Sequence, residues 1–326
     1  MEKIGLGIWA YGMGSDRYVG DGYIPYIPFE ERVRRAGKVK GLKGVEICYP
    51  FDVNKENIQE VKTLLADHGL QAICLIVEVV CDGEWATGSF SSPEEEQRMK
   101  AIKLTKEAMD VAIELGVETV NLWLGQDGFD YVFEIDYVAA WQRLIEGIRA
   151  CALYRQDVKI AIEYKVSEPK MKCMVNSGAK VLALAQATGQ ANVGAVLDVG
   201  HALNADENPA EIASVLLTSG RLFHLHLNDN YRIADDDMMF GSVRLLQSLE
   251  LFYWLKKLGY EGWYSLDLYP YRLDATKASQ VSIEFMEGVD AVADELLSND
   301  SFWSMEAADK IAWVHRRLFW GKGEKE

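Results

Sequence analysis

Eight short apolar runs alternate with longer amphipathic segments along most of this chain, and this alternation constrains the fold more than any other feature. The runs typical of strands cover 4–9, 44–48, 71–77, 118–123, 159–164, 192–198, 222–227 and 263–268. Helical patterns cover 29–40, 56–68, 92–116, 137–154, 176–187, 209–217, 241–258 and 275–297. Strands that alternate with helices predict a parallel sheet, and eight such units predict a closed (β/α)8 TIM barrel. The glycine-rich motifs of nucleotide-binding open sheets do not follow any of these runs.

We expect one barrel domain over 1–298 and a C-terminal helical extension over 299–326. A chain of 326 residues is within the usual size of a single α/β barrel. The extension is rich in aromatic residues, including Trp303, Trp313 and Trp320. It could cover a neighbouring subunit or pack on its own barrel.

Charge and composition exclude several classes of partner. The net charge of −16 opposes binding to nucleic acid, and no long basic run offsets it. The longest apolar tract, 70–81, contains Glu78 and is too short to span a membrane. Five cysteines form no C-x-x-C pair and indicate a reducing compartment, so we expect a cytoplasmic protein.

Each of the last four predicted strands ends near a side chain that can bind a metal ion. These four residues are Glu163, Asp198, His226 and Asp267. Barrel closure brings the carboxyl ends of the strands around one mouth, where three carboxylates would repel one another without a cation. Oxygen and nitrogen ligands without a thiolate favour Mg²⁺, Mn²⁺ or Co²⁺.

A second group of ligand type lies beside the first. It comprises His201, expected in the loop after the sixth strand, and Asp235 and Asp237, expected in the loop after the seventh. These residues predict a second cation site that shares carboxylates with the first. His224 lies two positions from His226 on the same face of its strand, and we expect it to support or line the site.

The ordered motifs that carry these residues resemble those of the xylose isomerases and the related L-rhamnose isomerases. The matching segments include WLGQDG at 123–128, EYKVSEPK at 163–170, DVGH at 198–201, DDDMMFG at 235–241 and DLYPYR at 267–272. Members of this family are metal-dependent aldose–ketose isomerases built on this barrel and are often dimers or tetramers. The resemblance therefore implies a small-molecule monosaccharide substrate and a homo-oligomer.

The resemblance also implies roles for individual residues. One cation, held by the four strand-end ligands, would bind two hydroxyl oxygens of an open-chain sugar. A second cation, held by His201, Asp235 and Asp237, would act in catalysis while Lys165 hydrogen-bonds the carbonyl oxygen. Hydrogen would pass between C1 and C2 as a hydride, with two divalent cations and no organic cofactor. His201 and Glu168 would also contact the substrate.

Four aromatic residues near strand ends are candidates for the apolar walls of the sugar pocket: Trp9, Trp85, Phe90 and Trp123. One departure from the family concerns ring opening, for which relatives use a histidine and an aspartate after the second strand. This chain has Tyr49 and Asp52 there, which we take as the candidates for that step. A tyrosine is a poor base at neutral pH.

Two other functions fit the same fold. A single-metal ketose 3-epimerase would need a pair of glutamates around one ion, where this chain has Asp267 on the eighth strand. A sugar-binding barrel without turnover is the other alternative, which the absence of the ring-opening histidine permits. A zinc endonuclease is disfavoured by the net charge of −16.

Overall fold

Eight parallel strands close into a barrel in the computed structural model, which describes residues 2–16, 18–80, 82–168 and 171–321. Around the ring the strands follow the order β1-β11-β10-β9-β6-β4-β3-β2. Their bounds are β1 (Ile4–Gly7), β2 (Gly44–Tyr49), β3 (Gln71–Val77), β4 (Thr119–Trp123), β6 (Lys159–Glu163), β9 (Val193–Asp198), β10 (Leu222–Leu227) and β11 (Tyr264–Leu266). The predicted (β/α)8 barrel is confirmed.

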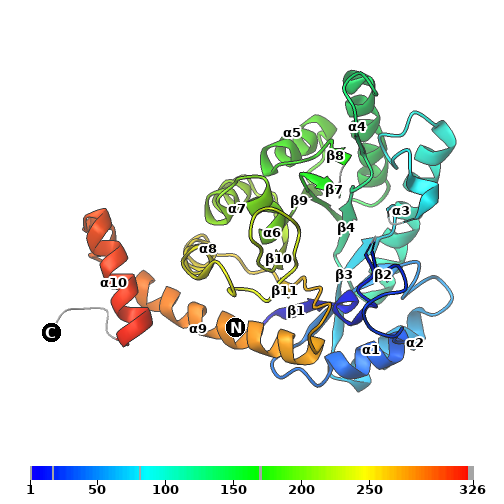
Figure 1. The fold of residues 1–326 in the computed structure, drawn as a ribbon. Helices are drawn as coiled ribbons and strands as arrows, with labels where there is room; N and C mark the ends of the chain where they lie inside the picture. Colours follow the sequence, from blue (N-terminus) through cyan, green and yellow to red (C-terminus); the bar gives the residue numbers. More distant parts are fainter. Residues whose placement is uncertain (1, 17, 81, 169–170, 322–326) are drawn as a thin grey trace.

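Helices surround this ring of strands (Figure 1). They are α1 (Phe29–Ala36), α2 (Ile58–Asp67), α3 (Glu95–Leu115), α4 (Tyr137–Tyr154), α5 (Gly178–Thr188), α7 (Pro209–Thr218), α8 (Leu245–Lys257) and α9 (Ala275–Leu297). Local sequence sets several of the boundaries. The carboxylate of Asp136 accepts hydrogen bonds from two backbone N–H groups at the start of α4, and Asn208 does the same for α7 before Pro209. Gly116 ends α3 with a φ of +80°, which glycine adopts without a steric penalty.

The strands are buried on both faces because helices cover them outside and side chains fill the barrel inside. Leu6, Leu75, Leu122 and Ile160 are fully buried. Removing each such side chain from water stabilises the fold by about 1.5–3 kcal/mol. Polar side chains are also buried inside the barrel, and these must find hydrogen-bond partners there.

Several local predictions were wrong in their boundaries, among them the following three. β1 ends at Gly7, and the chain then forms the short 3-10 helix η1 (Ile8–Tyr11), which contains Trp9. α3 begins at Glu95 rather than at Ser92, because Glu94 has extended backbone angles and serves as the N-cap. The segment after β9 is the short helix α6 (Val199–Asn204), not a loop.

Additional short elements lie outside the barrel. β5 (Gly128–Phe129), β8 (Met171–Cys173) and β7 (Ser167–Glu168) pair in an antiparallel sheet after β4 and β6. The 3-10 helix η2 (Gly83–Trp85) precedes α3. The periodic pattern did not predict these elements, because segments of two or three residues are too short to show a period.

The C-terminal extension contains η3 (Phe302–Ser304) and α10 (Ala307–Trp320). In Figure 1, α10 follows the far end of α9 and lies away from the ring of strands. Trp303 packs on Tyr253 of α8 with ring centroids 5.8 Å apart, so part of the extension contacts its own barrel. Phe319 and Trp320 are exposed. None of the helices in the described ranges is both long and apolar enough to cross a membrane.

Candidate active site

A cavity of about 350 Å³ opens among the carboxyl ends of the barrel strands. Its walls combine ionisable and aromatic side chains. The lining residues are Trp9, Ser15, Cys48, Ile76, Glu78, Trp123, Glu163, Lys165, Glu168, His201, His226, Asp235, Asp237, Asp267, Tyr269 and Tyr271. Its volume suits a small ligand, and its position is where barrel enzymes place their active sites.

The four strand-end residues predicted as the first metal site lie together. Each of Glu163, Asp198, His226 and Asp267 offers one ligand atom, and these atoms all lie within 4.8 Å of one another. Nδ1 of His226 lies 3.2 Å from Oδ2 of Asp267 and 3.4 Å from Oε1 of Glu163. Strand register explains part of this convergence, because His226 of β10 pairs directly with Asp198 of β9.

Neutral donors hold one oxygen of each carboxylate in this group without neutralising its charge. The contacts are Asn121 Nδ2 to Glu163 Oε2 at 2.6 Å, Asn228 Nδ2 to Asp198 Oδ2 at 2.9 Å, and Trp9 Nε1 to Asp267 Oδ1 at 2.6 Å. The second oxygen of Glu163 and of Asp267 faces His226. Hydrogen bonds of this kind orient carboxylate ligands around a metal ion.

A second group of ligand type shares Asp198 with the first. Asp198, His201 and Asp235 also place one ligand atom each within 4.8 Å of one another. Asp198 caps α6 by accepting a hydrogen bond from the backbone N–H of His201 at 2.8 Å, which holds His201 in the first turn of α6. Nε2 of His201 lies 3.2 Å from Oδ2 of Asp235.

Asp237, the third predicted ligand of the second site, lines the same cavity but lies outside this group. Its Oδ1 accepts a hydrogen bond from Nδ2 of Asn228 at 3.1 Å. Asn228 therefore bridges Asp237 and Asp198, which joins the loop after β10 to the end of β9. The predicted role of Asp237 as a ligand stays a prediction.

Burial and mutual repulsion perturb the acids of the site. Burial raises the pKa of Asp198 to about 7; His201 opposes the rise, whereas Asp267 and Glu163 add to it. Burial also raises the pKa of Asp237 well above its usual range, with Asp235 and Asp267 contributing. Conversely, burial would lower the pKa of His201, but Asp198 and Asp235 outweigh it and raise this pKa to about 9. The positive side chains of the cavity therefore do not fully offset the repulsion among its carboxylates.

Buried polar atoms without hydrogen-bond partners indicate whether a cation fits the two ligand groups. Among the described residues, Nδ1 of His201, Nδ1 of His226 and Oδ1 of Asp235 are buried without a hydrogen-bond partner. Each belongs to one of the two ligand groups. A buried unpaired nitrogen or oxygen is costly unless a ligand satisfies it, so the residues present fit divalent cations with oxygen and nitrogen coordination.

Lys165 places a positive charge beside the second group. Its Nζ lies 2.8 Å from Oδ2 of Asp235 and also pairs with Glu168, both on the cavity wall. Nζ lies 4.9 Å from the centroid of the Trp123 ring, a cation–π geometry. Trp9 and Trp123 line the cavity as predicted for its apolar walls.

Two predicted wall residues lie elsewhere. Trp85 and Phe90 are each 1% exposed within the hydrophobic core and do not line the cavity. The ring of Phe90 packs against Gly147 of α4, where an added Cβ would lie 2.6 Å from Cδ1 of Phe90. Proximity to a strand end could not separate these core residues from the pocket aromatics.

The two candidates for ring opening are also turned away from the cavity. The Tyr49 hydroxyl lies 3.5 Å from Oε2 of Glu107 on α3. Asp52 pairs with Arg32 of α1 at 2.6 Å and accepts the backbone N–H of Cys48 at 2.9 Å. Neither residue is among those that line the cavity. Arg32, on a neighbouring helix, binds the carboxylate of Asp52, and a role of these two residues in ring opening stays a prediction.

Two acids that the sequence reasoning missed lie at this site. Glu78, just after β3, lines the cavity beside Cys48, and its pKa is raised mainly by burial. The strand-end argument applied to β3 would have found it. Glu46 lies within β2 and contacts both histidines of β10. An acid inside an apolar strand, GVEICY, was the available signal.

Comparisons with known proteins agree with the barrel fold. Residues 33–289 match the family model described as "Xylose isomerase-like TIM barrel". Xylose isomerase from Thermus thermophilus is 26% identical over 211 residues, which cover 63% of this chain. The chain spans about half the length of that relative, 54%.

Solved structures of sugar epimerases share the fold. L-ribulose 3-epimerase aligns with a TM-score of 0.69 at 17% identity, covering 92% of this chain and 99% of that one. D-psicose 3-epimerase with D-tagatose from Clostridium cellulolyticum H10 aligns with a TM-score of 0.66 at 17% identity, covering 88% and 99%. The family match extends over most of the barrel, and this chain therefore belongs to the xylose isomerase-like TIM-barrel family.

Proposed function

We propose that this protein is a divalent-cation-dependent aldose–ketose isomerase that acts on an open-chain monosaccharide. One observation carries the proposal: two ligand groups adjoin at Asp198, and Lys165 stands beside the second. Cations held by these two groups would polarise two neighbouring sugar oxygens and stabilise the negative charge that develops on them. Mn²⁺, Mg²⁺ or Co²⁺ suits the ligand atoms, and the proposed chemistry needs no organic cofactor.

The side chains of the cavity have distinct parts in this proposal. Lys165 donates a hydrogen bond to the carbonyl oxygen of the open-chain sugar, because its ammonium group is held in the cavity by Asp235 and Glu168. Trp9 and Trp123 shield the transferring hydrogen from water. Glu78 and Cys48 line the wall next to the end of β2, so they replace Tyr49 and Asp52 as the groups that can contact the sugar there.

A ketose 3-epimerase is the second candidate, and the epimerase structures with the same fold favour it. That reaction needs two bases around one cation. Glu163 supplies one, but the other position holds Asp267, whose Oδ1 is occupied by Trp9 Nε1 at 2.6 Å. The second ligand group, with His201 and Asp235, would have no part in a reaction that uses one ion.

The test is a screen of pentoses and hexoses in D₂O with Mn²⁺-loaded, Mg²⁺-loaded or Co²⁺-loaded protein, followed by NMR of the products. We expect one aldose–ketose pair to interconvert with the transferring hydrogen retained, and a chelator to abolish the conversion. Deuterium at C3 without aldose formation would establish epimerisation instead. A sugar that binds without any conversion would support the non-catalytic alternative.

A further inference from the structure

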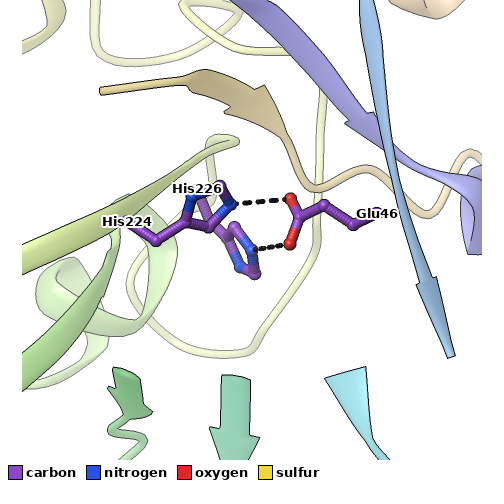
Figure 2. A group of neighbouring side chains, drawn as sticks. All are labelled: Glu46, His224 and His226. Carbon is purple, nitrogen blue, oxygen red and sulfur yellow. Dashed lines mark hydrogen bonds and ion pairs between the residues drawn. The ribbon is translucent and has the colours of Figure 1, made fainter. Parts of the chain in front are cut away.

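Glu46 is a fully buried carboxylate at the centre of the barrel, on a strand whose neighbouring side chains are apolar. Val45 and Ile47 on either side of it are also fully buried. Figure 2 shows the carboxylate of Glu46 directed at the rings of His224 and His226, which reach it from β10. β2 and β10 are not adjacent in the barrel, because β1 and β11 lie between them. The contact therefore crosses the barrel interior.

Each oxygen of Glu46 meets a different histidine. Oε1 lies 3.1 Å from Nε2 of His224, and Oε2 lies 3.1 Å from Nε2 of His226. The hydroxyl of Ser265 on β11 also donates to Oε1. Gly5 of β1 leaves space for this contact, since an added Cβ there would lie 2.9 Å from Oγ of Ser265. The carboxylate is thus held from three sides.

Glu46 is joined to His226 by a hydrogen bond, in which Nε2 of His226 lies 3.1 Å from Oε2 of Glu46. Ion-pair partners of Glu46 among the described residues are the imidazoles of His224 and His226, with no lysine or arginine. In a hydrogen bond between an imidazole and a carboxylate the ring N–H donates, so Nε2 of His226 carries the proton.

We propose that Glu46 is a positioning residue for the metal centre. Glu46 fixes His226 in the tautomer whose Nδ1 lone pair is free to coordinate a cation. With Nε2 protonated, Nδ1 is the ring atom available for coordination, and it faces Glu163 and Asp267 at 3.4 and 3.2 Å. Metal-ligating histidines commonly donate their other ring N–H to a carboxylate, which orients the ring and raises its basicity.

His224 lies on the other side of the carboxylate. Its ring stands at 84° to that of His226, with centroids 5.3 Å apart, and its Nε2 lies 3.1 Å from Oε1 of Glu46, at ion-pair distance but without a hydrogen bond. A rotation of the Glu46 carboxylate would break both contacts together. His224 does not line the cavity, so it acts on the site only through its contacts with Glu46 and His226.

The inference rests on the cation binding of the proposed function but not on which sugar reaction follows. The test compares Mn²⁺ affinity of the wild-type protein with that of Glu46→Gln, measured by calorimetry on chelator-treated protein. The amide retains the shape but presents N–H groups to one of the two rings, which favours the wrong tautomer of that ring. We expect affinity at the first site to fall about 10- to 100-fold, as is usual when such a partner is lost.

Glu207→Gln is the matched control because Glu207 is a carboxylate that accepts hydrogen bonds from Tyr164 at 2.7 Å and Gly178 N at 3.1 Å, away from both ligand groups. It should keep wild-type affinity. Glu46→Asp keeps the negative charge on a shorter side chain. Its Mn²⁺ affinity should lie between that of the wild type and that of Glu46→Gln. This second variant gives a result even if Glu46→Gln does not fold.

Nitrogen-15 NMR of labelled histidine in Mg²⁺-loaded protein gives a readout that does not depend on activity. His226 should show a protonated Nε2 and an unprotonated Nδ1, and Glu46→Gln should change this pattern. Unchanged affinity and an unchanged tautomer in Glu46→Gln would overturn the inference while leaving the proposed function intact. Tight cation binding without sugar conversion would overturn the proposed function alone, and absence of cation binding by the wild type would overturn both. Cation binding by Nε2 of both histidines would also overturn the inference.

Discussion

Nζ of Lys165 lies 2.8 Å from Oδ2 of Asp235, although one residue follows β6 and the other lies in the loop after β10. Burial would lower the pKa of Lys165, but Asp235 and Glu168 outweigh it and raise the pKa above its usual range. The ammonium group is therefore charged at neutral pH. It stands where the second ligand group meets the cavity, which makes it the donor best placed for a sugar oxygen.

Replacement of Lys165 by methionine should lower kcat/KM by about 100- to 1,000-fold, because a preorganised donor to a developing negative charge is removed. Cation affinity should not fall, since the change removes a positive charge beside Asp235. Steady-state kinetics and metal titration measure the two effects separately. Tyr49→Phe is the control, because the Tyr49 hydroxyl contacts Glu107 and does not line the cavity. A comparable loss of activity in Tyr49→Phe would contradict the assignment of this wall.

Replacement of Asp235 by asparagine should reduce the bound cations from two per chain to one. Asp235 belongs to the second ligand group only, whereas the first group contains Glu163, Asp198, His226 and Asp267. Native mass spectrometry across a Mn²⁺ titration would measure the stoichiometry. Two cations bound at wild-type affinity would show that Asp235 is not a ligand.

Asp237→Asn is the companion variant. Asp237 lines the same cavity as Asp235, but it accepts a hydrogen bond from Asn228. We expect it to weaken the second cation while the first stays bound. An unchanged second site in Asp237→Asn, with a lost one in Asp235→Asn, would limit the ligands of that site to the group of Asp198, His201 and Asp235.

Replacement of Asp127 by asparagine should change how stability depends on pH. Asp127 is buried after β4 and accepts the backbone N–H groups of Ser89 at 3.2 Å and Ser91 at 2.5 Å. Burial raises its pKa although these hydrogen bonds oppose the rise. An asparagine keeps an acceptor for both N–H groups and cannot ionise.

The sign follows from proton linkage. Because the pKa of Asp127 is higher in the folded state, the folded wild type binds more protons than the unfolded chain above the ordinary aspartate pKa of about 3.9. Wild-type stability is therefore lost as pH rises from the unfolded-state pKa to the folded-state pKa, by about 1.4 kcal/mol for each pH unit that separates the two. Urea denaturation from pH 4 to pH 8 should show Asp127→Asn gaining relative to the wild type as pH rises. A difference that does not vary with pH would refute this.

The barrel and the first ligand group could be predicted from the amino-acid pattern alone. Eight strand-helix units permit few other folds, and side chains at the carboxyl ends of parallel barrel strands must converge on one mouth. Glu163, Asp198, His226 and Asp267 could be found for that reason alone. Asp235 was predicted from the acidic residues in the loop after the seventh strand, and Lys165 from the family motifs; both line the same cavity.

Which side chains turn toward the cavity and which support it depends on tertiary packing. Barrel strands are buried on both faces, so an apolar or aromatic residue near a strand end gives no sign of the face it takes. Tyr49 and Asp52 turn toward Glu107 and Arg32 on the surrounding helices, and Trp85 lies in the core. The contact between Glu46 and His226 depends on barrel closure, because it joins strands that are neither consecutive nor adjacent. The spacing of residues along the chain therefore cannot predict it.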